Sequence, residues 1–65
     1  MKGTIIEYVL GGEFGYLKDE NKDEYCFYSD DIQFEKSLLR KGDKVYFDLY
    51  AGHGIRAINI RKNKN

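Results

Sequence analysis

Short runs of alternating apolar and polar residues, separated by glycine or polar turns, constrain the fold of this chain most. In the run 44–50, one set of alternate positions is Val45, Phe47 and Leu49, and polar or aromatic residues occupy the positions between them. A period of two is that of a β-strand, and no segment sustains the 3.6-residue period of a long helix. With no proline and seven glycines, the chain has its turns at glycine and at short polar segments. The pattern predicts an all-β fold.

Turn signals divide the sequence into five expected strands, at 4–10, 14–18, 24–28, 44–50 and 55–60. Polar or glycine-rich turns separate them, except that a helical turn at 29–32 and an irregular connection at 33–41 precede the fourth strand. Leu38 and Leu39 are expected to tuck under this connection. Three meandering strands, a long connection and a hairpin fit a five-stranded antiparallel Greek-key barrel, because closure hides the edges of a short sheet.

Alternation also predicts which side chains face the core. The expected inward set is Ile5, Leu17, Cys26, Ile32, Val45, Phe47, Leu49, Ile58 and Ile60. Glu24 has the same parity as Cys26, so we expect its carboxylate to reach solvent at the barrel rim.

Five aromatic residues lie between positions 14 and 28: Phe14, Tyr16, Tyr25, Phe27 and Tyr28. If Leu17 and Cys26 face inward, alternation places the first four rings outward, and Tyr28, at its strand end, can lie on either face. Aromatic rings on the surface of a sheet can stack on unpaired bases, since every base has a π face. The sequence therefore predicts an aromatic surface patch.

The size and composition limit the remaining possibilities. The 65 residues predict one domain at 1–62, followed by a basic tail at 63–65 that is either frayed or a phosphate-contacting arm. Cys26 is the single cysteine, and we expect it to be a buried side chain in a reducing compartment. One cysteine and one histidine cannot supply the ligands of a multi-cysteine zinc site, so neither a metal nor a cofactor is expected. No run approaches the roughly 20 apolar residues of a membrane span. We expect a soluble cytoplasmic protein.

The charge balance and the absence of a recognisable set of catalytic side chains limit the functions expected of this chain. The net charge is zero, with 11 basic and 11 acidic residues, which argues against nucleic-acid binding dominated by charge. His53 lies between two glycines, and no serine or cysteine is visibly paired with it. We therefore expect no enzyme, no catalytic residue and no small-molecule substrate.

Two aromatic motifs resemble those of the bacterial cold-shock proteins. The family's Lys-Gly-Phe-Gly-Phe-Ile corresponds here to Gly12-Glu13-Phe14-Gly15-Tyr16-Leu17, and its Val-Phe-Val-His-Phe to Glu24-Tyr25-Cys26-Phe27-Tyr28. The segments 42–47 and 57–60 are also similar to the family's last two strands. The resemblance spans about residues 3–60 and implies a cold-shock-type OB-fold barrel.

The resemblance also implies binding of single-stranded RNA or DNA, in a role such as RNA chaperone or modulator of transcription or translation. The stacking residues it implies are Phe14, Tyr16, Tyr25, Phe27 and Tyr28, with Tyr8 and Phe34 at the edges. Lys18, next to the predicted patch, and Arg56, at the start of the last expected strand, are the candidates for contacts to the nucleic-acid backbone.

Some positions depart from the family pattern. Glu7 stands where the family has a tryptophan, and Ile6 where it has the preceding lysine. The lysine and first glycine of the first motif are Gly12 and Glu13 here. Because Glu7 and Glu13 would repel phosphate, the alternative is a protein-interaction module that uses the same patch for a protein partner. We expect a monomer, with self-association through the patch as a variant.

Overall fold

The structure is a computed structural model, and it describes residues 1–9 and 11–62. Its strands are β1 (Lys2–Tyr8), β2 (Phe14–Asp19), β3 (Glu24–Tyr28), β4 (Lys44–Gly52) and β5 (Gly54–Lys62). Two short 3-10 turns, η1 (Ser29–Asp31) and η2 (Lys36–Leu38), lie between β3 and β4. The all-β prediction is confirmed. The predicted tail at 63–65 and the predicted strand position Leu10 lie outside the described residues.

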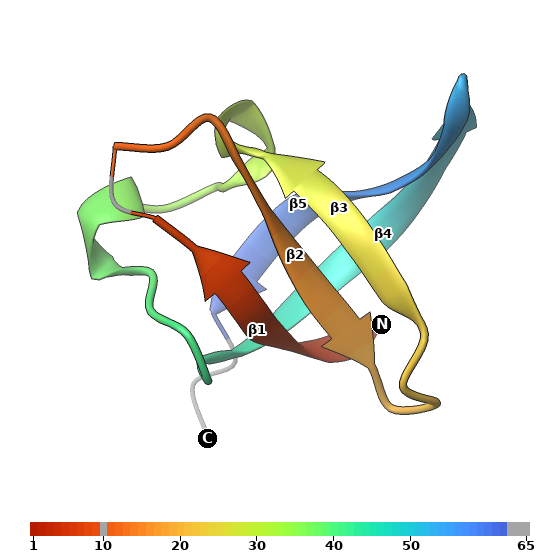
Figure 1. Ribbon diagram of the computed structural model, residues 1–65, viewed down its shortest axis with the longest axis horizontal. Helices are drawn as coiled ribbons and strands as arrows, with labels where there is room; N and C mark the ends of the chain where they lie inside the picture. Colours follow the sequence, from red (N-terminus) through yellow and green to blue (C-terminus); the bar gives the residue numbers. More distant parts are fainter. Residues whose placement is uncertain (10, 63–65) are drawn as a thin grey trace.

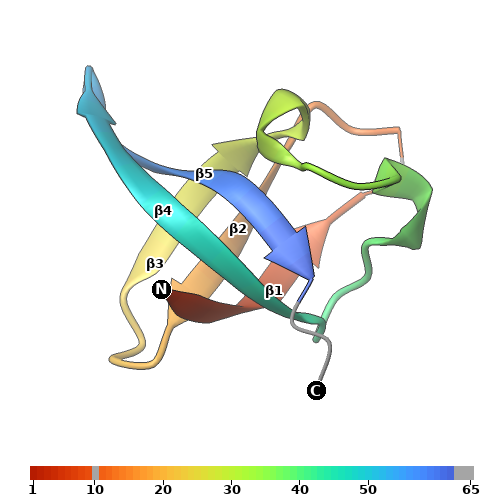
Figure 2. The ribbon, with the colours of Figure 1, turned by 180° about the vertical axis from the view of Figure 1, so that it is seen from behind.

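The five strands form one antiparallel sheet in the order β3-β2-β1-β4-β5. The sheet curls, so that β1, β2 and β3 form one side and the β4–β5 hairpin crosses behind them (Figures 1 and 2). The edge strands β3 and β5 approach each other without a hydrogen-bonded ladder, which leaves a gap in the sheet. An isolated parallel bridge joins Ile32, just after η1, to Ile60 of β5. The sheet is therefore five-stranded and strongly curled, but it is not closed.

An apolar core lies between the two sides of the curled sheet. It consists of Ile5, Leu17, Phe27, Ile32, Leu39, Val45, Phe47, Ala57 and Ile60. Among the predicted inward residues, three do not belong to it: Cys26 and Ile58 are half-buried, and Leu49 is 38% exposed. The prediction that Leu39 tucks under the connection is confirmed, whereas Leu38 is exposed.

The register of the β2–β3 hairpin explains the error at Cys26. Leu17 is the ladder partner of Tyr25, and Gly15 that of Phe27, so Tyr25 and Phe27 face inward with Leu17. This register follows from the turn at 19–23, where the Asp19 carboxylate accepts hydrogen bonds from the turn's backbone N–H groups. A one-residue change of register turns every side chain of a strand to its other face.

The same register removes the difficulty posed by Glu24. Glu24 is the ladder partner of Lys18 and is exposed, so its carboxylate lies on the outer face of the sheet rather than at an inward position. An inward-facing glutamate is unfavourable, and this was the signal in the sequence that Glu24 and Cys26 do not face the core.

A bulge in β5 explains the error at Ile58. Asn59 has a positive φ of 53°, a conformation that asparagine tolerates better than most residues, and it adds one residue to the strand. Ala57 and Ile60 consequently share the inward face, and Ile58 lies opposite Asp48. Hydrogen bonds from Asn59 and Arg61 to Asp48 lower the pKa of that carboxyl group.

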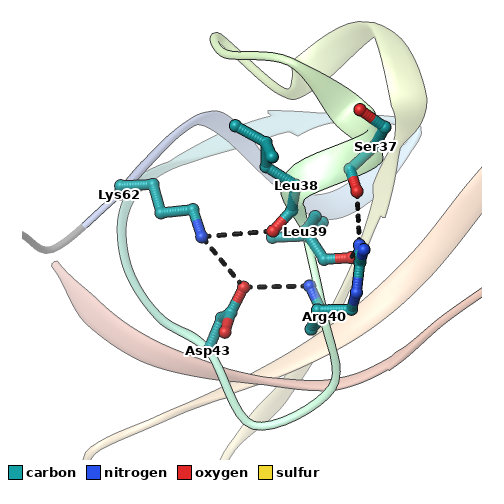
Figure 3. Close-up of polar contacts among 6 residues, drawn as sticks. All are labelled: Ser37, Leu38, Leu39, Arg40, Asp43 and Lys62. Atoms are coloured by element: carbon teal, nitrogen blue, oxygen red, sulfur yellow. Dashed lines mark hydrogen bonds and ion pairs between the residues drawn. The ribbon is translucent and has the colours of Figure 1, made fainter.

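Polar contacts hold the connection between β3 and β4 against the end of β5 (Figure 3). Lys62 Nζ donates to the carbonyl oxygen of Leu38 (3.2 Å) and lies 3.1 Å from Asp43 Oδ2. The backbone N–H of Arg40 donates to the same carboxylate oxygen (2.9 Å), and its guanidinium donates to the carbonyl of Ser37. These contacts fix a segment that has little regular secondary structure.

Candidate nucleic-acid interface

Three aromatic rings form an exposed patch on the outer face of β2 and β3. Phe14, Tyr16 and Tyr28, here called the ring patch, are 53%, 40% and 49% exposed. Phe14 and Tyr28 are ladder partners, and the Phe14 and Tyr16 ring centroids lie 5.9 Å apart with an interplanar angle of 88°. The predicted outward positions of Phe14 and Tyr16 are confirmed, and Tyr28 is outward as well.

Phe27 belongs to the core, so its predicted role in base stacking is wrong. Its side chain is 0% exposed and its ring passes beneath Gly15. A Cβ atom at Gly15 would lie 2.7 Å from Phe27 Cζ and 2.5 Å from the Glu7 carbonyl oxygen, and this close approach requires a glycine. The motif glycine therefore makes room for a core ring under the ring patch.

Tyr25 also faces inward, and its predicted stacking role is wrong for the same reason of register. Its half-buried ring packs against the core at 6.0 Å from the Phe47 centroid. Burial, together with the negative charges of Asp19 and Asp23, raises the pKa of the Tyr25 hydroxyl, which lies 3.5 Å from Asp19 Oδ2. Tyr25 thus closes the end of the core near the 19–23 turn.

Tyr8 and Phe34, the predicted edges of the stacking surface, are half-buried and pack against the core. The Tyr8 ring lies 5.8 Å from that of Phe27. Lys62 Nζ lies 5.4 Å from the centroid of the Phe34 ring, within the range of a cation–π contact. Neither ring joins the ring patch.

Arg56 lies between two tyrosine rings at the end of the ring patch. Its guanidinium carbon is 5.1 Å from the Tyr28 centroid and 5.2 Å from the Tyr50 centroid. Asp31 holds it there: Asp31 Oδ2 lies 3.4 Å from Nε, and Oδ1 accepts a hydrogen bond of 3.5 Å from the guanidinium. Because Asp31 also accepts a hydrogen bond of 2.9 Å from the Tyr28 backbone N–H, one carboxylate ties the end of β3 to β5.

A groove of about 290 Å³ adjoins this cluster. It lies between β3 and the β4–β5 hairpin, where the sheet is not closed, and is lined by Cys26, Tyr28, Tyr50, His53, Gly54, Ile55 and Arg56. Rings, a cation and a hollow are thus adjacent on one side of the molecule. This combination suits a flat aromatic ligand with hydrogen-bond acceptors at its edge.

Charges of both signs surround the ring patch. Glu7 is the ladder partner of Tyr16 and is exposed, and the exposed Glu13 precedes Phe14. Lys18 is exposed on the same face of β2 as Phe14 and Tyr16, which fits its predicted position beside the patch. Arg56 is also beside the patch, but Asp31 offsets its charge.

The site includes three residues that the sequence pattern does not predict for it: Tyr50, Asp31 and Cys26. Alternation placed Tyr50 outward correctly, but its proximity to Tyr28 depends on the curl of the sheet. Asp31 lies in the segment 29–32, where the sequence pattern predicts only a helical turn. Cys26 was assigned to the core and instead lines the groove.

Among residues 1–9 and 11–62, no group of three or more His, Cys, Asp or Glu side chains is arranged to hold a metal ion. Within these residues there is also no helix with the length and apolarity needed to cross a membrane.

The sequence matches no protein-family model, and no curated protein matches it either.

Proposed function

We propose that this protein binds single-stranded RNA or DNA by stacking unpaired bases on the ring patch, with little sequence preference. The observation that carries the proposal is the presence of three exposed rings on one face beside a guanidinium held between two tyrosines. Rings and guanidinium planes are the groups on which bases stack in single-strand binding proteins.

The structure reduces the number of rings available and thus the expected affinity. Base stacking contributes about 1–3 kcal/mol per base, judged by substitution of the ring with alanine. Phe14, Tyr16 and Tyr28 are available, together with Tyr50 and Arg56, whereas Phe27 is not. Because Lys18 and Arg56 are the candidates for phosphate contacts, we expect a shallow salt dependence, with a slope of about −1.4 for two contacts to a single strand.

We also propose that the curled sheet is an OB-fold barrel of the cold-shock type. The strand order and the approach of β3 to β5 support this, as do the outward rings of the Phe14-Gly15-Tyr16 motif. In the observed register, Cys26 and Tyr28 rather than Tyr25 and Phe27 are the outward pair of the second motif. A domain that binds only unpaired strands shifts the equilibrium of weak RNA structure toward the unpaired form, which would suit an RNA chaperone in the cytoplasm or a modulator of transcription or translation.

A protein partner is the second candidate. It is favoured by the position of Glu7 opposite Tyr16 and of Glu13 next to Phe14, since two carboxylates at the edge of the patch would repel phosphate. Exposed aromatic clusters are also typical of interface hot spots. We infer no catalytic activity for either candidate.

Titration of labelled oligouridine and oligothymidine, about eight nucleotides long, tests the proposal by fluorescence anisotropy at low salt. Phe14→Ala should weaken binding by roughly 5- to 150-fold, which corresponds to the loss of one stacked base. Phe14→Leu is the matched variant, because it keeps apolar bulk but removes the π face.

Ser37→Ala, an exposed substitution outside the ring patch and the groove, is the control and should leave affinity unchanged. The absence of binding by the folded wild-type protein would contradict the nucleic-acid proposal and favour a protein partner. Binding that Phe14→Ala and Tyr28→Ala both leave unchanged would contradict the stacking mechanism alone.

A further inference from the structure

The tip of the β4–β5 hairpin projects from the body of the molecule (Figures 1 and 2). This segment, residues 49–55 and here called the hairpin arm, reads Leu-Tyr-Ala-Gly-His-Gly-Ile and is exposed at every position. Lysine, arginine, aspartate and glutamate make up 34% of the sequence, yet none occurs in the arm, and no other uncharged run of this length exists in the chain.

One edge of the arm has no strand beside it among the described residues. Strand β1 pairs with β4 from Lys44 to Tyr46, and Met1 exchanges backbone hydrogen bonds with Phe47. From Asp48 to Gly52, β4 pairs with β5 alone within the described chain. Its other edge therefore presents backbone N–H and C=O groups to solvent. Proteins usually protect such an edge with lysine, proline or a covering segment, and the arm has neither lysine nor proline.

The apolar side chains of the arm lie on one face. Ala51 and Ile55 are ladder partners, and Leu49 precedes Ala51 by two residues, so the three share a face, whereas Tyr50 and Arg56 share the other. An exposed, uncharged edge with an apolar face is a typical site for the addition of another strand.

We propose that the β4 edge of the hairpin arm pairs antiparallel with the same edge of a second copy of this chain. A twofold axis at Tyr50 would place Leu49 opposite Ala51 of the second copy and Asp48 opposite Gly52. No position in this register sets one charge against a like charge, and the net charge of zero adds no general repulsion between copies.

Charge is the reason to choose a second copy as the occupant. The other two outer edges, those of β3 and β5, approach each other across the gap in the sheet and carry charged residues, among them Glu24 and Arg61. The edge of the arm faces no other strand within the described residues, and its self-paired register sets no like charges opposite each other. An interface of this length is small, so the dimer is expected to be weak and reversible.

This dimer would leave the ring patch open and extend it. Tyr50 lies on the face of the arm that contacts Arg56, so the two Tyr50 rings would lie side by side at the axis. Two ring patches would then form one surface, on which a longer strand gains effective concentration at its second site.

Sedimentation equilibrium over about 20 µM to about 1 mM tests the proposal, since this range detects the weak association expected of a small interface. The wild-type chain should show a monomer–dimer equilibrium. Ala51→Lys should weaken dimerisation on the order of tenfold or more, because it places a lysine in the apolar stripe. Ala51→Val should strengthen dimerisation through greater β-propensity and apolar area.

Ser37→Lys is the matched control, because it adds the same charge at an exposed position of η2 and should leave the equilibrium unchanged. A wild-type chain that stays monomeric to about 1 mM would overturn the proposal, as would an Ala51→Lys variant that dimerises like the wild type. Oligonucleotide affinity is measured on the same samples at a concentration where all are monomeric, so that failure of either proposal is seen separately.

Discussion

The burial of Phe27 leads to a sharp contrast between two neighbouring phenylalanines. Both were expected to stack on bases, but Phe27 is 0% exposed and Phe14 is 53% exposed. Phe27→Ala removes a ring that packs against Tyr8 and beneath Gly15, whereas Phe14→Ala removes a ring that lies largely in solvent.

The magnitudes follow from burial. Replacing a buried phenylalanine with alanine costs about 3–5 kcal/mol, from lost transfer free energy and the cavity that remains. At about 0.05–0.15 kcal/mol per residue, a chain of 65 residues has a free energy of unfolding of about 3–10 kcal/mol. Phe27→Ala should therefore remove a large part of the stability, while Phe14→Ala should change it by no more than about 0.5 kcal/mol.

Urea denaturation followed by far-ultraviolet circular dichroism measures both effects, since the chain has no tryptophan to report. Phe27→Leu, which keeps most of the core volume, should cost less than about 1.5 kcal/mol and provides a folded variant. It should bind oligonucleotides as the wild type does. A Phe27→Ala variant destabilised by less than about 1 kcal/mol that also loses oligonucleotide binding would refute the placement of Phe27 in the core.

The remaining predictions concern the carboxylates and the glycine that shape the site. Asp31→Ala should lower the free energy of unfolding by about 1–2 kcal/mol, because β3 loses a backbone hydrogen bond and Arg56 loses a partly exposed ion pair, and urea midpoints measure this. Asp31→Asn, which keeps one acceptor, should lose less, and equal stability of all three proteins would contradict the role of this carboxylate. The folded-state pKa of Asp48 lies below its ordinary value of 3.8. The stability that the charged Asp48 carboxylate contributes is therefore present above pH 3.8 and is lost as the pH falls through the folded-state pKa. In the Asp48→Asn variant, the free energy of unfolding should fall less steeply as the pH is lowered through the acid range. The same steepness as in the wild type would contradict the stabilising role of the Asp48 carboxylate. Gly15→Ala should be destabilising by more than a typical surface substitution, because the new Cβ meets the Phe27 ring and a backbone carbonyl. Thermal denaturation would show a lower midpoint, and a midpoint equal to the wild type would contradict the close approach at this position.

Much of the fold could be predicted from local pattern. Alternation and turn residues identified the five strands, because the side-chain period of a strand and the chemistry of a turn are properties of a few adjacent residues. The outward positions of Phe14 and Tyr16 followed in the same way, since Leu17 between Tyr16 and Lys18 fixes the parity of β2.

The errors occurred where one strand had to be related to another. The inward position of Phe27 depends on the length and hydrogen bonding of the 19–23 turn, and that of Ala57 on the bulge at Asn59. Each of these shifts the pattern by one residue and exchanges the two faces of a strand.

Local sequence pattern is thus enough to establish an all-β chain with more aromatic rings than its core can hold. Which rings are exposed depends on the folded sheet, which also brings Tyr50 and Arg56, far along the chain, beside Tyr28. Alternation along a strand is local, whereas register and sheet curvature arise from contacts between strands that are distant in sequence.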